Sequence, residues 1–208
     1  MHERLSRLRR SAAFELVFLV VVAAALALSV QAYAVKPYRI PSESMEPTLH
    51  VGDRVLVNRA SHRLGAEPRI GDVVVFHPPA GADAASPRCG AEGEGEGSAM
   101  PCSRPTDGRS SQTFVKRVVA VGGDEIALSG GRVVRNGRLR NEPYARPCEG
   151  SAECQFSVAV TVPRGHVYLL GDNRGASQDS RFWGPVPMSW VIGEATVIYW
   201  PPGRAGPL

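Results

Sequence analysis

The apolar residues are distributed in two different ways along the chain. Residues 16–35 form 20 consecutive positions without a charged side chain. An α-helix rises about 1.5 Å per residue, so a helix of this length matches the roughly 30 Å hydrocarbon core of a bilayer. The pattern therefore predicts a transmembrane helix over 16–35, after an N-terminal tail of residues 1–15.

Beyond residue 35, apolar residues come in short, valine-rich runs separated by Gly-Asp and Asn-Gly turn signals. Runs of β-branched residues between turn signals are typical of strands, and no segment of useful length repeats with a helical period. We therefore expect residues 36–208 to form a mostly β domain, an antiparallel barrel or sandwich, with a small β subdomain over 126–162. The expected strands are 53–57, 72–76, 114–121, 125–128, 132–135, 155–162, 166–170 and 191–200.

One long segment departs from this strand pattern. Residues 80–112 are rich in Gly, Ser, Pro and Glu, with Glu and Gly alternating over 92–97. Such a composition cannot bury enough apolar surface to order the chain. We expect a flexible loop inserted into the β domain.

The charge distribution indicates a membrane orientation rather than nucleic acid binding. The formal charge is +4 at pH 7, and residues 1–10 hold four arginines against one glutamate, which leaves +1 for the rest of the chain. A nearly neutral body lacks the electrostatic footprint of a nucleic-acid-binding protein. Arginines ahead of the apolar segment place the tail in the cytoplasm and the β domain outside, by the positive-inside bias.

The apolar segment has a second interpretation, as a cleavable signal peptide. Ala32-Tyr33-Ala34 matches the A-x-A pattern of a signal-peptide cleavage site. The apolar stretch is longer than the usual core of a signal peptide, which favours a retained anchor. The same three residues make the bond after Ala34 a candidate for self-cleavage.

The cysteines indicate disulfides rather than a metal site. There are four cysteines, all beyond the apolar segment, where an oxidising compartment preserves bridges. Four cysteines allow three pairings, of which Cys89–Cys102 and Cys148–Cys154 are the most local in sequence. No C-x-x-C or histidine spacing supports a metal site, and we expect none.

Lysine is rare in this chain, since arginine carries most of the positive charge. The two lysines are Lys36 and Lys116, and Lys116 lies inside the apolar run 113–121. A desolvated amine loses its proton near neutral pH and acts as a base, whereas a guanidinium stays protonated. An ordinary half-exposed lysine on an edge strand is the alternative interpretation.

Four segments together resemble the bacterial type I signal peptidases, which are membrane-anchored Ser-Lys endopeptidases. They follow one another in the order of that family, just after an N-terminal membrane segment, and the resemblance covers most of residues 10–200. Four motifs in order are far more specific than any one of them. The segments are PSESMEPTL (41–49), GDRVLVN (52–58), KRVVAVGGD (116–124) and GDNRGASQDSR (171–181).

The resemblance implies Ser44 as the nucleophile, Lys116 as its general base and Ser42 as a donor to the oxyanion. A serine hydroxyl needs such an adjacent base, and none of the five histidines stands in a recognisable triad context. Ser177 is implied to orient the lysine, within a polar and ionic shell made of Asp172, Asp179 and Arg181. The implied pockets for small substrate residues are lined by Ile40, Pro41, Met45, Leu49, Phe114 and Val115.

The chain departs from the family pattern at Gly175 and Ala176, where Asp and Asn are usual. The resemblance implies a single-pass membrane serine endopeptidase that removes signal peptides from exported preproteins after A-x-A sites. It implies an extracytoplasmic catalytic domain, contact with the lipid bilayer, a monomer, no nucleic acid partner and no cofactor. The alternatives are a specialised Ser-Lys processing peptidase of the conjugation type and a non-catalytic, membrane-tethered β domain.

Overall fold

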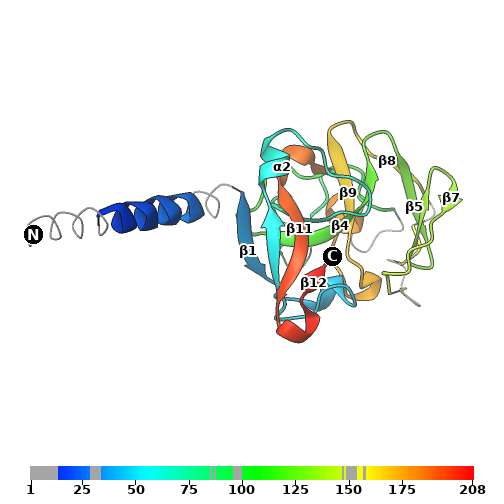
Figure 1. Cartoon of the computed structure of the whole chain (residues 1–208). Coiled ribbons are helices and arrows are strands. Elements are labelled where there is room, and N and C mark those ends of the chain that lie inside the picture. The colour runs from blue at the N-terminus through cyan, green and yellow to red at the C-terminus, as the bar shows by residue number, and fades with distance from the viewer. Residues whose placement is uncertain are drawn as a thin grey trace, which may run out of the picture.

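The computed structural model describes residues 14–28, 34–84, 86, 88–95, 100–146, 148, 154–156 and 158–208. Residues 14–28 are helical, shown in dark blue in Figure 1. Among the helices within these ranges, none has the length and apolar character needed to cross a membrane. The predicted span over 16–35 includes 29–33, which lie outside the described residues, as do positions 1–13 of the predicted tail.

The β domain is built on one large antiparallel sheet. Its strands pair in the order β1-β2-β11-β3-β4-β9-β10, and β12 pairs with β11. This agrees with the predicted mostly β, antiparallel class. The strands are β1 (Val35–Arg39), β2 (Arg54–Asn58), β3 (Val73–Phe76), β4 (Phe114–Val121), β9 (His166–Leu170), β10 (Val186–Pro187), β11 (Val191–Trp200) and β12 (Gly206–Pro207).

A smaller antiparallel sheet lies beside β9, at the end of the domain opposite β1 (Figure 1). Its order is β7-β6-β5-β8, and its core packs side chains such as Ile126 and Phe156 against Ala120 of β4 and Leu170 of β9. The predicted strand over 155–162 is much shorter in the structure, because only two of its residues pair with β5. The strands are β5 (Glu125–Ser129), β6 (Arg132–Arg135), β7 (Arg138–Leu139) and β8 (Val160–Thr161).

Helical segments in the described part of the β domain are short. The α-helices are α2 (Ala60–Arg63) and α3 (Ser180–Trp183). The 3₁₀ turns are Glu43–Met45, Arg174–Ala176, Met188–Trp190 and Pro202–Arg204.

The central strand β3 explains why the large sheet has apolar cores on both faces. Side chains alternate across a strand, so a continuous apolar run fits a strand that is covered on both sides. Val73 and Val75 pack with Ile40 and other residues of one cluster, whereas Val74 and Phe76 pack in another. All four side chains of β3 are buried. This double burial holds the neighbouring strand β4 in the middle of the domain.

The described residues of the loop over 80–112 pack against α3. Cys89 and Cys102 are joined by a disulfide, and Cys102 is fully buried. The backbone N–H of Cys102 donates a hydrogen bond of 2.9 Å to the carbonyl of Arg181. A second disulfide joins Cys148 to Cys154, beside Gly131 in the turn between β5 and β6. The first bridge closes the loop on itself, and the hydrogen bond from Cys102 connects the loop to the segment that carries Asp179 and Arg181.

Candidate active site

Ser44 lies in the 3₁₀ turn that follows β1. Its neighbour Met45 is buried in the core, which anchors the turn, and Ser44 itself is only 7 % exposed. The carbonyl of Ser44 accepts a hydrogen bond of 3.1 Å from the backbone N–H of Asn173. Gly171 approaches the same carbonyl so closely that a Cβ atom there would clash with it. The turn is therefore held between the core and the segment after β9.

Lys116 projects from β4 towards Ser44, 72 residues away in sequence. Its Nζ lies 2.6 Å from Ser44 Oγ, and the side chain is 4 % exposed. Phe114, two residues earlier on the same face of the strand, places its ring centroid 6.0 Å from Nζ. Burial lowers the pKa of Lys116 from 10.5 to about 8. The pair has the geometry of a hydroxyl nucleophile and an amine base.

The buried ion pair of Asp179 and Arg181 is the main charged neighbour of this amine. Arg181 donates to Asp179 at 2.7 and 3.0 Å, and neither side chain is accessible to solvent by more than 1 %. Burial alone would raise the pKa of Asp179, but the charge and hydrogen bonds of Arg181 lower it overall. The Asp179 carboxylate favours the protonated form of Lys116 and the Arg181 guanidinium favours the neutral form. Because the two charges oppose one another, burial decides the result.

Ser177 is 6 % exposed and lies beside Gly171, where a Cβ atom would clash with its hydroxyl. Its hydroxyl donates a long hydrogen bond of 3.5 Å to the carbonyl of Gln178, and its own carbonyl accepts from Arg181 at 2.9 Å. Within the described residues, no hydrogen bond joins Ser177 to Lys116. The orienting role that the family resemblance implies for Ser177 stays a prediction.

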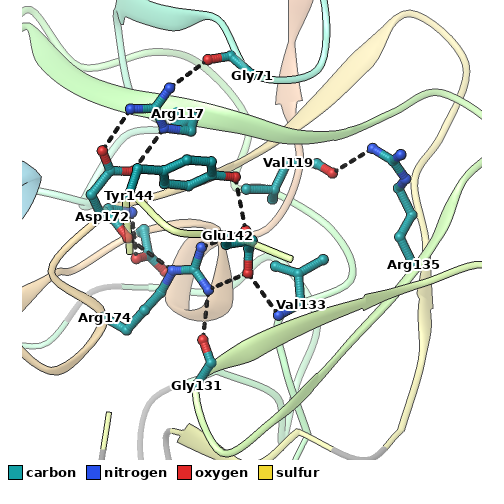
Figure 2. Close-up of polar contacts among 12 residues, drawn as sticks. Gly71, Arg117, Val119, Gly131, Val133, Arg135, Glu142, Tyr144, Asp172 and Arg174 are labelled. Carbon is teal, nitrogen blue, oxygen red and sulfur yellow. Dashed lines mark hydrogen bonds and ion pairs between the residues drawn. The ribbon is translucent and has the colours of Figure 1, made fainter. Parts of the chain in front are cut away.

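Asp172, which lies just after the end of β9, belongs to a second ion pair. It is fully buried and accepts two bonds from Arg117, at 2.8 and 2.7 Å, and one from Thr48 at 2.5 Å. Figure 2 shows Arg117 between Asp172 and the carbonyl of Gly71. Thr48 and Arg117 lie inside the quoted motifs, next to the implied catalytic positions, yet sequence reasoning did not select them.

Ser42 is exposed at the start of the turn that carries Ser44. The two hydroxyl oxygens lie 3.3 Å apart. Ser42 therefore stands at the solvent side of the nucleophile, close enough to direct its hydroxyl to a carbonyl oxygen bound there.

A groove leads to the Ser44–Lys116 pair between the end of β1 and the start of β4. Phe114, Val115 and Lys116 pair with β3 on one edge, and β9 begins to pair only at Arg117, so no described strand covers their other edge. Leu49, which was predicted to line the pockets, is fully buried in the core and does not reach the groove. The lining residues are Tyr38, Arg39, Ile40, Pro41, Ser42, Ser44, Met45, Gln112, Thr113, Phe114, Val115, Lys116, Ala176 and Gln178.

The described residues contain no cluster of three or more His, Cys, Asp or Glu side chains that could hold a metal ion. The groove itself presents the hydroxyls of Ser42 and Ser44 and the amine of Lys116.

Comparisons with known proteins point to one family. The family model described as signal peptidase, peptidase S26, matches residues 13–200. A probable signal peptidase I of Mycobacterium leprae is 36% identical over 95% of this chain and 80% of its own, and signal peptidase I of Leptolyngbya laminosa is 35% identical over 88% and 77%. A crystal structure of signal peptidase I from Enterococcus faecalis is 23% identical, with a TM-score of 0.39 over 63% of this chain and 98% of that one.

Proposed function

The chain belongs to the signal peptidase family, peptidase S26, and we propose that it removes N-terminal signal peptides from exported preproteins by a Ser-Lys mechanism. The observation that supports this mechanism is the 2.6 Å contact between Lys116 Nζ and Ser44 Oγ in a buried site. The base in this position is the neutral form of Lys116. With a pKa of about 8, about one tenth of the Lys116 side chains are neutral at pH 7 and able to accept the serine proton. An exposed lysine with a pKa of 10.5 is neutral in only about one molecule in three thousand at that pH.

In the proposed acylation step, Ser44 Oγ attacks the carbonyl carbon of the scissile bond while its proton passes to Lys116 Nζ. The developing oxyanion accepts hydrogen bonds from the backbone N–H of Ser44 and the hydroxyl of Ser42. The protonated amine then gives its proton to the leaving nitrogen, and the C–N bond breaks. The signal peptide remains as an ester on Ser44, and the mature protein leaves with a new amino terminus.

In the proposed deacylation step, a water molecule attacks the ester carbon and gives a proton to the neutral amine of Lys116. The same oxyanion donors stabilise the second tetrahedral intermediate. The ester C–O bond breaks, Ser44 recovers its proton from Lys116, and the signal peptide leaves as a carboxylic acid that loses its remaining proton to the solvent. One amine therefore serves both steps.

The groove supports recognition of an extended peptide with small side chains. The uncovered edge of Phe114–Lys116 offers main-chain groups to which a substrate strand can pair. Ile40, Met45 and Val115 line the groove with bulky apolar groups, and we infer that the space left beside them is shallow. Alanine at the −1 and −3 positions of the substrate fits such space, whereas a larger side chain meets the lining.

We also propose that the apolar stretch 16–35 anchors the enzyme, with the tail 1–15 in the cytoplasm and residues 36–208 as the extracytoplasmic catalytic domain. Its uncharged composition supports this proposal. An anchored enzyme acts at the bilayer surface, where preproteins present the end of their own apolar segment. Extraction of membranes at alkaline pH tests this proposal, since an anchored chain stays with the lipid.

The test of the mechanism uses the full chain in detergent and a preprotein with an A-x-A site. Ser44→Ala abolishes cleavage, and Lys116→Arg loses a factor of about 10²–10⁴, because a guanidinium cannot act as the base. Lys36→Arg is the matched control, since Lys36 is the other lysine of the chain and is exposed on β1. Lys116→Arg with more than a few per cent of wild-type activity refutes the assignment of the base.

A further inference from the structure

Glu142 accepts an unusual number of hydrogen bonds for a residue outside the groove. It lies in the connection between β7 and β8, and its carboxylate is paired with Arg174; the side chains are 5 % and 1 % exposed. One carboxylate oxygen accepts from Arg174 at 2.7 Å and from the Tyr144 hydroxyl at 3.0 Å. The other accepts from Arg174 and from the Val133 backbone N–H, both at 3.0 Å. Figure 2 shows these contacts converging on Glu142.

Tyr144 connects this cluster to the second ion pair. Its ring lies under the Arg117 guanidinium, 4.1 Å from the ring centroid, in the geometry of a cation–π contact. Arg117 in turn donates two hydrogen bonds to Asp172. The hydroxyl of Tyr144 donates to Glu142 while the ring packs against Arg117, so one residue in the connection between β7 and β8 contacts both ion pairs.

The Arg117–Asp172 and Arg174–Glu142 ion pairs each include one residue of the loop 171–174. This loop contacts the residue that carries the nucleophile, Ser44. Arg174 donates through Nε to the carbonyl of Gly171 at 3.0 Å. Asn173, between the two charged residues of the loop, donates its backbone N–H to the carbonyl of Ser44. The backbone of the loop is thus in direct contact with the backbone of the turn that presents Ser44.

We propose that Glu142, assisted by Tyr144, is a positioning residue for peptide cleavage: it holds the loop 171–174, and through this loop the Ser44 main chain, in the arrangement that stabilises the oxyanion. This inference rests on the proposed function. The connection between β7 and β8 then contributes to the reaction without lining the groove. A shift of about 1 Å at a catalytic group is enough to cost about 10²-fold in rate.

The chemistry of the cluster requires a carboxylate at position 142. All four donors that surround it point hydrogens at its two oxygens, so a side-chain amide would direct its own N–H groups at two donors. A buried ionic network of this kind is stable only when every member has its partners. Glu142→Gln therefore displaces Arg174 while keeping the size of the side chain.

The experiment compares Glu142→Gln with Glu125→Gln in the full chain in detergent, with a peptide substrate that carries an A-x-A site. Glu125 is exposed on β5 of the small sheet and serves as the matched control. We expect kcat of Glu142→Gln to fall roughly 10- to 100-fold while KM stays within about twofold. The pH midpoint of kcat is expected to stay close to the wild-type value, because burial is the main cause of the lowered pKa of Lys116 and the charge of Asp172 is the smallest of its causes.

Tyr144→Phe provides a second variant in case Glu142→Gln fails to fold. It removes one hydrogen bond to Glu142 and keeps the ring under Arg117, so we expect a fall in kcat of roughly fivefold, again with KM unchanged. Wild-type kcat in the folded variant, or a loss that follows only the unfolded fraction or only KM, overturns the positioning role. Absence of cleavage by the wild-type chain, or equal cleavage by Ser44→Ala, overturns the proposed function itself, and neither result involves a change at Glu142 or Tyr144.

Discussion

Gly171→Ala tests whether the close contact between the loop 171–174 and the Ser44 turn sets the geometry of the reaction. A Cβ atom at position 171 would lie under 3.0 Å from the Ser44 carbonyl oxygen and from the Ser177 hydroxyl, well inside the 3.4 Å at which ordinary contact begins. The Ser44 oxygen belongs to the backbone and cannot rotate away. The loop and the turn must therefore separate by up to about 1 Å.

We expect this separation to lower kcat by roughly 10²-fold, because a displacement of this size at a catalytic group has such an effect. Overpacking of a tight contact also lowers the free energy of unfolding by about 1–3 kcal/mol. The φ angle of Gly171 lies outside the left-handed region, so alanine adds bulk there without backbone strain. The effect is thus purely one of space.

Steady-state cleavage of an A-x-A peptide gives kcat and KM, and thermal unfolding of the same samples shows that the fold is intact. Gly203→Ala is the matched control, because a Cβ atom at Gly203 meets nothing within 4 Å. We expect this control to keep the wild-type kcat. A folded Gly171→Ala protein that also keeps the wild-type kcat would refute the idea that this contact positions Ser44.

Four further predictions concern the site and the loop beside it. The cleavage rate should rise with pH to a plateau, with a midpoint near 8, because only the neutral amine of Lys116 accepts a proton and burial has lowered its pKa to about 8. Asp179→Asn should move this midpoint to lower pH, since it removes a charge that favours the protonated amine; a midpoint that rises would contradict the sign. Ser42→Ala should lower kcat by roughly 10²–10³ with little change in KM, as expected for the loss of one oxyanion donor, and a change in KM alone would place Ser42 in ground-state binding. Replacement of Cys89 and Cys102 by serine should lower the free energy of unfolding by about 3 kcal/mol in chemical denaturation, and peptide mapping without reductant should find the bridge in the parent protein.

The strand pattern was predictable because it depends on local properties. Valine-rich runs between turn signals located β2, β3, β4, β5, β6, β9 and β11 to within about a residue at each end. The run over 155–162 was misleading: Phe156, Val160 and Val162 pack in the core of the small sheet, yet among its described residues only Val160–Thr161 pair with a strand. Whether an apolar residue pairs or merely packs depends on its neighbours in space, which a local pattern does not contain.

The sequence by itself determined the chemical groups: a serine and a lysine in motifs of one family, and a single amine in an apolar run. Only the tertiary structure decided that Lys116 is buried and lies 2.6 Å from Ser44, because β4 and the turn after β1 meet through long-range packing. Leu49 is close to Ser44 in sequence but turns into the core, whereas Glu142 lies in no recognised motif and reaches the loop 171–174 through Arg174. The physical reason is that burial and ion pairing are set by segments that fold together from distant parts of the chain, and a motif records only the residues that are adjacent in sequence.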